Sequence, residues 1–195
     1  MVMQWRPPWP LIPLVIAVVL VCAAYGLIIG RMRRRSYVTD EAAFRMRPKA
    51  EGEIYVDPEV LQKGGSALQG EDYQSLALKA LQIVNEERKK AGLSQLHWDE
   101  SLAACAMVRA MELPDSFSHV RPNGENWYTV CPDLMYGENL ACGFDTAEQA
   151  VTAWMESPKH QENILRPGFV SCGIGVYRYN GRLYWGQEFS YYESQ

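Results

Sequence analysis

An unbroken apolar run near the start of the chain constrains its architecture most. Residues 11–30 read LIPLVIAVVLVCAAYGLIIG, 20 positions without a charge, and this length matches the hydrocarbon core of a bilayer. We expect a transmembrane helix after a short tail (residues 1–10) rather than a cleaved signal peptide, because Arg6 alone is charged before it and no small-residue cleavage site follows. About 150 residues remain for the rest, which suits one domain.

The residues after this run bear on the orientation in the membrane. A basic cluster follows directly, consisting of Arg31, Arg33, Arg34 and Arg35, and such clusters normally stay on the cytoplasmic side. The resemblance described below favours the extracellular side slightly, so both orientations stay open. Within residues 31–72 the chain is polar, with prolines and a Gly-Gly pair and no sustained apolar periodicity, which predicts a tether from about residue 36 onward. The folded domain is expected at 73–195.

The charge distribution excludes one class of partner. From Ala50 onward the chain has 11 Lys and Arg against 21 Asp and Glu, although its overall net charge is only -4. An acidic domain repels phosphate backbones, so nucleic-acid binding is not expected.

The cysteines leave two readings open. Cys22 lies in the apolar run, and the other four are Cys105, Cys131, Cys142 and Cys172. These four could form two disulfides, with three possible pairings, or could be buried as small apolar side chains. No CxxC spacing occurs, which argues against a thiolate zinc site.

The domain sequence alternates helical and extended segments. Helices are predicted at 73–91, from a cap at Asp99 to Pro114, from a cap at Thr146 to residue 157, and in a short stretch opened by Pro158. Residues 136–143 favour a short strand or extended turn. Two strands, 172–179 and 182–192, flank Asn180-Gly181, a strong hairpin signal. The pattern predicts an α+β class or three-layer αβα sandwich with a mostly antiparallel sheet.

Five separated segments resemble one family in order and spacing. They are IVNEERKKAGLSQLHWDESLAACAMVRA, SFSHVRPNG, YGENLACG, AWMESPKHQENIL and CGIGVYRYNGRLYWGQEF. Together they resemble the CAP or SCP superfamily (cysteine-rich secretory protein, antigen 5, pathogenesis-related 1), and in particular its bacterial branch. The resemblance implies an αβα sandwich with a shallow cleft lined by two histidines and acidic residues.

Matched position by position, the resemblance implies a cleft built around three residues. The histidines fall on His119 and His160, and the first glutamate falls on Glu138. Animal and plant members commonly carry a second glutamate three residues after a tryptophan, where this chain has Ser157. Glu156 and Glu188 are candidate replacements, although Glu156 would point about 100 degrees away on a helix.

Three chemistries are compatible with these residues. Two imidazoles and a carboxylate could hold a divalent metal such as zinc, bound weakly, because no local pattern such as HExxH fixes the ligands in advance. Acid-base catalysis would need a nucleophile, and the available serines, Ser118, Ser157 and Ser171, lie in no GxSxG motif. A third reading is a hydrogen-bonded network that fixes loops without any ligand.

The function we expect is that of a bacterial cell-envelope protein held by a single-pass anchor. Its CAP domain would bind a peptide, a cell-wall polymer or a small ligand without catalysis. The alternatives are a metal-assisted hydrolase of peptide or cell-wall substrates and a lipid- or sterol-binding protein with a groove lined by aromatic residues. We assign no catalytic residue.

Overall fold

The computed structural model describes residues 36–47, 54–68 and 73–194, which belong to a compact unit beginning at Ser36. The predicted anchor at residues 11–30 and the basic cluster after it lie outside the described residues. Within the described ranges, no helix has the length and apolar character needed to cross a bilayer.

A mixed sheet forms the centre of the fold, in the order β1-β4-β6-β5-β3, with β2 also paired to β4. Only β3 and β5 are parallel among these pairs. Asn180 and Gly181 have φ values of 48° and 73°, as their hairpin turn requires. The strands are β1 (Tyr37–Val38), β2 (Ala43–Phe44), β3 (His97–Trp98), β4 (Gly137–Cys142), β5 (Ser171–Tyr179) and β6 (Arg182–Ser190).

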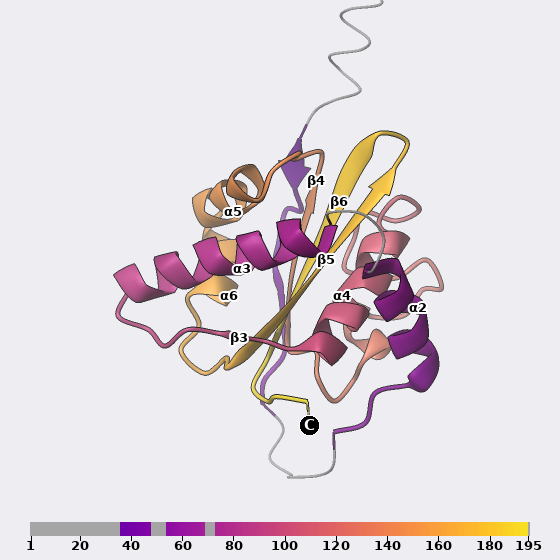
Figure 1. The fold of residues 1–195 in the computed structure, drawn as a ribbon, viewed down its shortest axis with the longest axis horizontal. Helices are drawn as coiled ribbons and strands as arrows, with labels where there is room; N and C mark the ends of the chain where they lie inside the picture. Colours follow the sequence, from indigo (N-terminus) through magenta and orange to yellow (C-terminus); the bar gives the residue numbers. More distant parts are fainter. Residues whose placement is uncertain (1–35, 48–53, 69–72, 195) are drawn as a thin grey trace, which may run out of the picture. The chain divides into compact units, whose positions relative to one another are not determined.

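Helices cover both faces of the sheet (Figure 1). One face carries α4 (Glu100–Glu112), with α2 (Pro58–Leu68) packed on it. The other carries α3 (Tyr73–Lys90), α5 (Ala147–Glu156) and α6 (Pro158–Ile164). The Asp99 carboxylate accepts a hydrogen bond from Leu102 N at 2.9 Å, and the Thr146 hydroxyl accepts one from Gln149 N at 3.3 Å. Both predicted caps are therefore present. The mixed sheet with helices on both faces confirms the predicted α+β class.

Glycines on the strands let α4 lie directly against the sheet. A Cβ on Gly173 would lie 2.3 Å from Ala103 N, and one on Gly175 would lie 2.4 Å from the Met107 backbone. Such distances are far below van der Waals contact, so only glycine fits at these positions. The close approach brings side chains of α4 within reach of β4 and β6.

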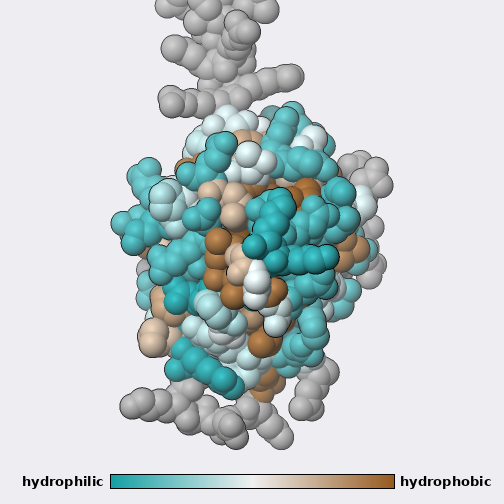
Figure 2. All heavy atoms as spheres, turned by 90° about the vertical axis from the view of Figure 1, so that its left-hand side faces the viewer, coloured by the Kyte–Doolittle hydropathy of each residue, from teal (hydrophilic) through white to brown (hydrophobic). Residues whose placement is uncertain are grey.

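Aromatic side chains fill the core on the opposite face. Trp154 and Trp185 are fully buried and meet edge to face, with ring centroids 6.5 Å apart. Trp127 is also buried, in a second cluster beside α4. On the side of the molecule with α5 and α6, Figure 2 shows a narrow band of hydrophobic residues between hydrophilic ones. Trp127, Trp154 and Trp185 are thus core residues.

The predicted tether differs from the structure. Residues 36–47, which we call the strap, pair with β4 through β1 and β2, and residues 54–68 include α2, which packs on α4. Each strap strand has two residues, too few for an alternating pattern to be visible in the sequence. The apolar side chains that pack onto the cores are isolated ones: Val38, Phe44, Ile54, Val56 and Val60.

The structure has one disulfide and two buried thiols among the four domain cysteines. Cys105 on α4 is bonded to Cys131 just after the short 3-10 helix Trp127–Val130, with Cα atoms 6.2 Å apart. Cys142 and Cys172 are free and buried. The bridge joins α4 to the segment that leads into β4.

Candidate functional site

A buried ion pair between α4 and β4 forms the base of the site. Glu138 and Arg109 are both fully buried, and Arg109 Nε lies 2.7 Å from Glu138 Oε2. Arg109 also donates to Glu112 Oε2 at 2.6 Å and to the Ser118 carbonyl at 2.7 Å. A buried guanidinium needs such partners because an unpaired charge in a protein interior is costly.

His119 lies above this pair, in the loop after α4. Its Nδ1 is 2.6 Å from Glu138 Oε1, and its side chain is 22% exposed. An antiparallel bridge between Val120 and Asn126 and a hydrogen bond from Trp127 N to the His119 carbonyl at 3.0 Å hold the loop. His119 Nε2 contacts the carbonyl of Glu41 in the strap.

His160 approaches the same point from α6. Its Nε2 lies 2.9 Å from Thr39 Oγ1, while His119 Nε2 is 3.5 Å from that oxygen. Its Nδ1 is 2.7 Å from Ser157 Oγ. Ser157 occupies the N-cap position of α6 but makes no side-chain cap hydrogen bond. The serine at the position of the second family glutamate thus orients His160.

The hydrogen bonds define the tautomer of His160. The Thr39 hydroxyl donates to the Glu41 carbonyl at 2.6 Å, so it accepts from His160 Nε2, and His160 Nδ1 accepts from the Ser157 hydroxyl. Burial, with the charge of His119 as a smaller cause, lowers the pKa of His160 to about 4. His160 is therefore neutral at pH 7.

His119 has the opposite preference. Burial opposes its charge, but the hydrogen bond and charge of Glu138 outweigh this and raise the pKa of His119. Burial likewise opposes ionisation of Glu138, yet Arg109 and His119 lower the pKa of this carboxyl. Glu138 is therefore an anion that bonds to both Arg109 and His119.

Glu188 lies beside Glu138 on the next strand. The two are paired in register across β4 and β6, so both side chains face α4. Burial and the charge of Glu138 raise the pKa of Glu188 well above its usual value. Neither carboxyl oxygen has a hydrogen-bond partner among the described residues. Glu156, by contrast, is exposed on α5 and takes no part in the cluster.

Comparison with known proteins connects this geometry to a family. The model of the cysteine-rich secretory protein family, CAP, matches residues 81–189. The chain belongs to the CAP family. YkwD of Bacillus subtilis is 36% identical over 118 residues, covering 57% of this chain and 45% of that protein. The membrane protein YlbC of the same organism is 28% identical over 120 residues, covering 56% and 32%. The chain thus spans less than half the length of both relatives.

Solved structures share the CAP fold. An extracellular protein containing an SCP domain from Bacillus anthracis has a TM-score of 0.55 at 22% identity, covering 72% of this chain and 45% of that one. An outer surface protein of Borrelia burgdorferi has a TM-score of 0.50 at 21% identity, covering 59% and 90%. Relatives named as membrane, extracellular and outer surface proteins are therefore among the CAP proteins similar to this chain.

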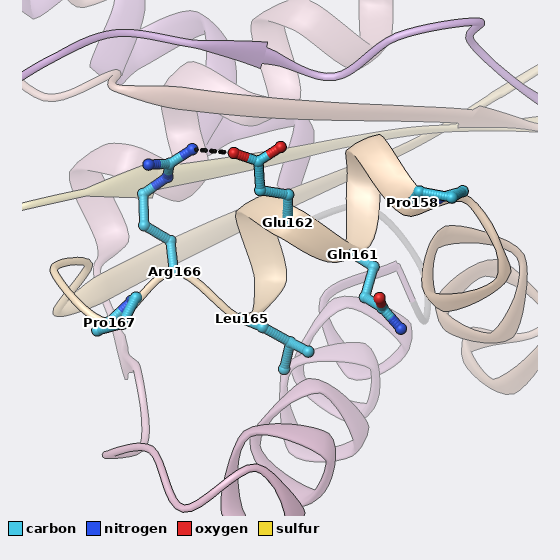
Figure 3. Close-up of a pocket in the computed structure, with 6 residues that line it drawn as sticks. All are labelled: Pro158, Gln161, Glu162, Leu165, Arg166 and Pro167. Atoms are coloured by element: carbon cyan, nitrogen blue, oxygen red, sulfur yellow. Dashed lines mark hydrogen bonds and ion pairs between the residues drawn. The ribbon is translucent and has the colours of Figure 1, made fainter.

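We call the cluster of His119, Glu138 and His160 the CAP site, and a hollow of about 350 Å³ reaches it at His119. Residues 37–41 of the strap line one side, and residues 117–119 line the other. A separate hollow of about 530 Å³ lies along α6 (Figure 3). Its lining residues Pro158, Gln161, Glu162 and Leu165 follow helical spacing on one face, whereas His160 is buried on another. That second hollow is not part of the histidine cluster.

Two contributors to the CAP site were not among the sequence candidates. Arg109 has a signal in the sequence, because it directly follows the apolar stretch LAACAMV on a predicted helix, and an arginine that is buried there needs an acidic partner. Thr39 has none, because a single threonine outside any regular element carries no pattern. Ser118 and Ser171 do not join the cluster through their hydroxyls, which bond to Val120 N and the Tyr192 carbonyl.

Proposed function

We propose that this CAP protein is a cell-envelope binding module, anchored through residues 11–30, whose cleft holds a ligand between His119 and His160. The observation that carries the proposal is the convergence of both Nε2 atoms on one hydroxyl oxygen, at 2.9 and 3.5 Å. A hydroxyl or carbonyl of a ligand is the kind of group that this pair is suited to bind.

The protonation states favour binding over acid-base catalysis. A general base works best with a pKa near the operating pH, whereas the pKa of His160 is lowered to about 4. His119 has a raised pKa and contacts Glu138 through Nδ1 and Glu41 through Nε2. Ser157 Oγ lies 2.7 Å from His160 Nδ1, but among the described residues no carboxylate bonds to that imidazole, as a serine-histidine pair would need.

The experiment is a binding screen of the purified full chain in detergent with cell-wall glycan fragments, extended peptides and short lipids, read by fluorescence anisotropy. Binding that weakens at least about tenfold in His119→Ala and His160→Ala, the loss of about one good hydrogen bond, supports the proposal. Lys90→Ala, on the exposed end of α3, is the matched control. Turnover of the bound compound that depends on His119 would contradict it.

A metal-assisted hydrolase is the second candidate, favoured by the same convergence of two imidazoles. Glu138 bonds to His119 Nδ1 and to Arg109. A carboxylate in this position orients a metal-binding histidine and does not itself bind the metal. Among the described residues, no group of three His, Cys, Asp or Glu side chains could hold an ion. His119 and His160 would thus hold zinc as a pair, and the ion would supply Lewis acidity to a bound carbonyl. Zinc titration by calorimetry, with His160→Ala as the comparison, separates tight from weak binding.

We place the CAP domain on the extracellular side of the membrane. The Cys105–Cys131 disulfide supports this side, because such bonds persist in oxidising compartments and are reduced in the cytoplasm. Rapid alkylation of intact cells, followed by mass spectrometry, would find this pair oxidised. A pair that is alkylated before reduction would instead support the cytoplasmic side predicted by the four arginines.

A further inference from the structure

The strap completes the cleft by adding to an open sheet edge. One edge of β4 is bonded to β6 along its whole length, whereas within the described part of the chain the other edge pairs only with the two-residue strands β1 and β2. An edge strand is a template for another extended chain. The strap lies outside the family match at residues 81–189.

Three side chains of the strap act as anchors. Thr39 meets the two histidines, as described above. The ring of Phe44 lies beneath the guanidinium of Arg166, at 3.4 Å from Cζ to the ring centroid. Arg45 lies over Tyr128 at 4.0 Å and donates to the carbonyls of Pro132 and Met135.

Backbone groups of the strap are bound as well. The Ala43 carbonyl accepts from Asn163 Nδ2 at 2.9 Å, and Arg45 N donates to the Tyr136 carbonyl at 2.7 Å. His119 Nε2 donates to the Glu41 carbonyl. Backbone contacts of this kind accept any extended polypeptide, while pockets for alternate side chains supply selectivity.

We propose that the ligand of the cleft is an extended polypeptide segment that adds as a strand to β4, and that the strap is its intramolecular counterpart. The segment carries a hydroxyl residue at the position of Thr39 and an aromatic-basic pair at the positions of Phe44 and Arg45. This inference rests on the proposed binding function and names its ligand class. The strap competes with the ligand, so the apparent affinity is reduced by the fraction of molecules whose cleft is covered.

The test uses a fluorescent peptide with the sequence of residues 36–47 and the full chain in detergent. The Phe44→Ala chain is expected to bind the peptide at least about tenfold more tightly than the wild type, because its own strap competes less. Met46→Ala is the matched control, since Met46 is in the strap but 79% exposed, and should bind like the wild type. Peptides with Thr39→Val or Phe44→Ala should bind at least about tenfold more weakly.

Hydrogen exchange on the same samples shows whether the strap opened and the fold survived. Faster exchange in β4, with α4 still protected, is the expected pattern; if Phe44→Ala unfolds the chain, Thr39→Val replaces it. The proposal is overturned if the β4 amides exchange faster but the peptide does not bind more tightly. It is also overturned if neither Phe44→Ala nor Thr39→Val opens the strap. If the protein sediments as a dimer, the β4 edge is assigned to the strap of a second copy, and this result also overturns the proposal. Binding of a glycan or lipid that depends on His119, without peptide binding, overturns this inference but leaves the proposed function intact.

Discussion

At the scale of single residues, the Arg109–Glu138 pair is the feature on which the site depends most. Removing one partner of a buried ion pair leaves an uncompensated charge, so Arg109→Leu should lower the free energy of unfolding by about 3–5 kcal/mol. Urea denaturation at pH 7 measures this. Lys90→Ala removes a largely exposed pair with Glu87, and because such a pair contributes little to stability, its loss should be far smaller than that of Arg109→Leu. Equal losses in the two variants would contradict the described burial.

Glu188 gives a prediction with a definite pH dependence. Its folded-state pKa is raised, so above about pH 4.5 the unfolded chain releases a proton that the folded chain retains, and folding becomes less favourable. Glu188→Gln removes this cost. The variant should therefore gain stability relative to the wild type as pH rises above 4.5, measured by denaturation across a pH series.

His160 provides a control, because its effect on the pH dependence of stability has the opposite sign. Its folded-state pKa is lowered from 6.5 to about 4, so its contribution is present above pH 6.5 and is lost as pH falls toward 4. In His160→Gln the stability relative to the wild type should therefore rise on acidification across that window. If Glu188→Gln and His160→Gln change the pH dependence of stability in the same direction, the assigned protonation states are not correct.

At the scale of elements, the approach of α4 to the sheet sets the position of Arg109. Gly173→Ala would place a Cβ 2.3 Å from Ala103 N, so α4 must move away. We expect a loss of about 3 kcal/mol in unfolding free energy, the upper range for an overpacked core, together with weaker ligand binding. Gly65→Ala in α2, where a Cβ meets nothing within 4 Å, should instead gain about 0.5–1 kcal/mol. Calorimetric melting of both variants tests the contrast.

The elements also show which parts of the fold the sequence could predict. Long periodic segments and the caps at Asp99 and Thr146 were predictable because their signals are local. The strap was not predictable, because its strands have two residues each and are extended only through their pairing with β4. The parallel pairing of β3 with β5 was missed for the same reason.

At the scale of the whole molecule, three distant segments supply one cluster. His119, Glu138 and His160 could be selected from the sequence because each lies in a motif that resembles the family. The neighbouring position of Glu188 follows from the register of β4 and β6, which no sequence pattern specifies. Thr39 reaches the histidines only because the strap pairs with β4, so its role required the structure.

The central claim is that His119 and His160 meet at the Thr39 hydroxyl with pKa values shifted in opposite directions. The chain has three histidines, so imidazole ¹⁵N NMR over a pH series can follow each of them. We predict that His160 stays neutral, with the proton on Nε2, until the pH falls to about 4, while His119 remains protonated above pH 6.5. Two histidines that titrate together at pH 6.5, like solvent-exposed side chains, would contradict the account.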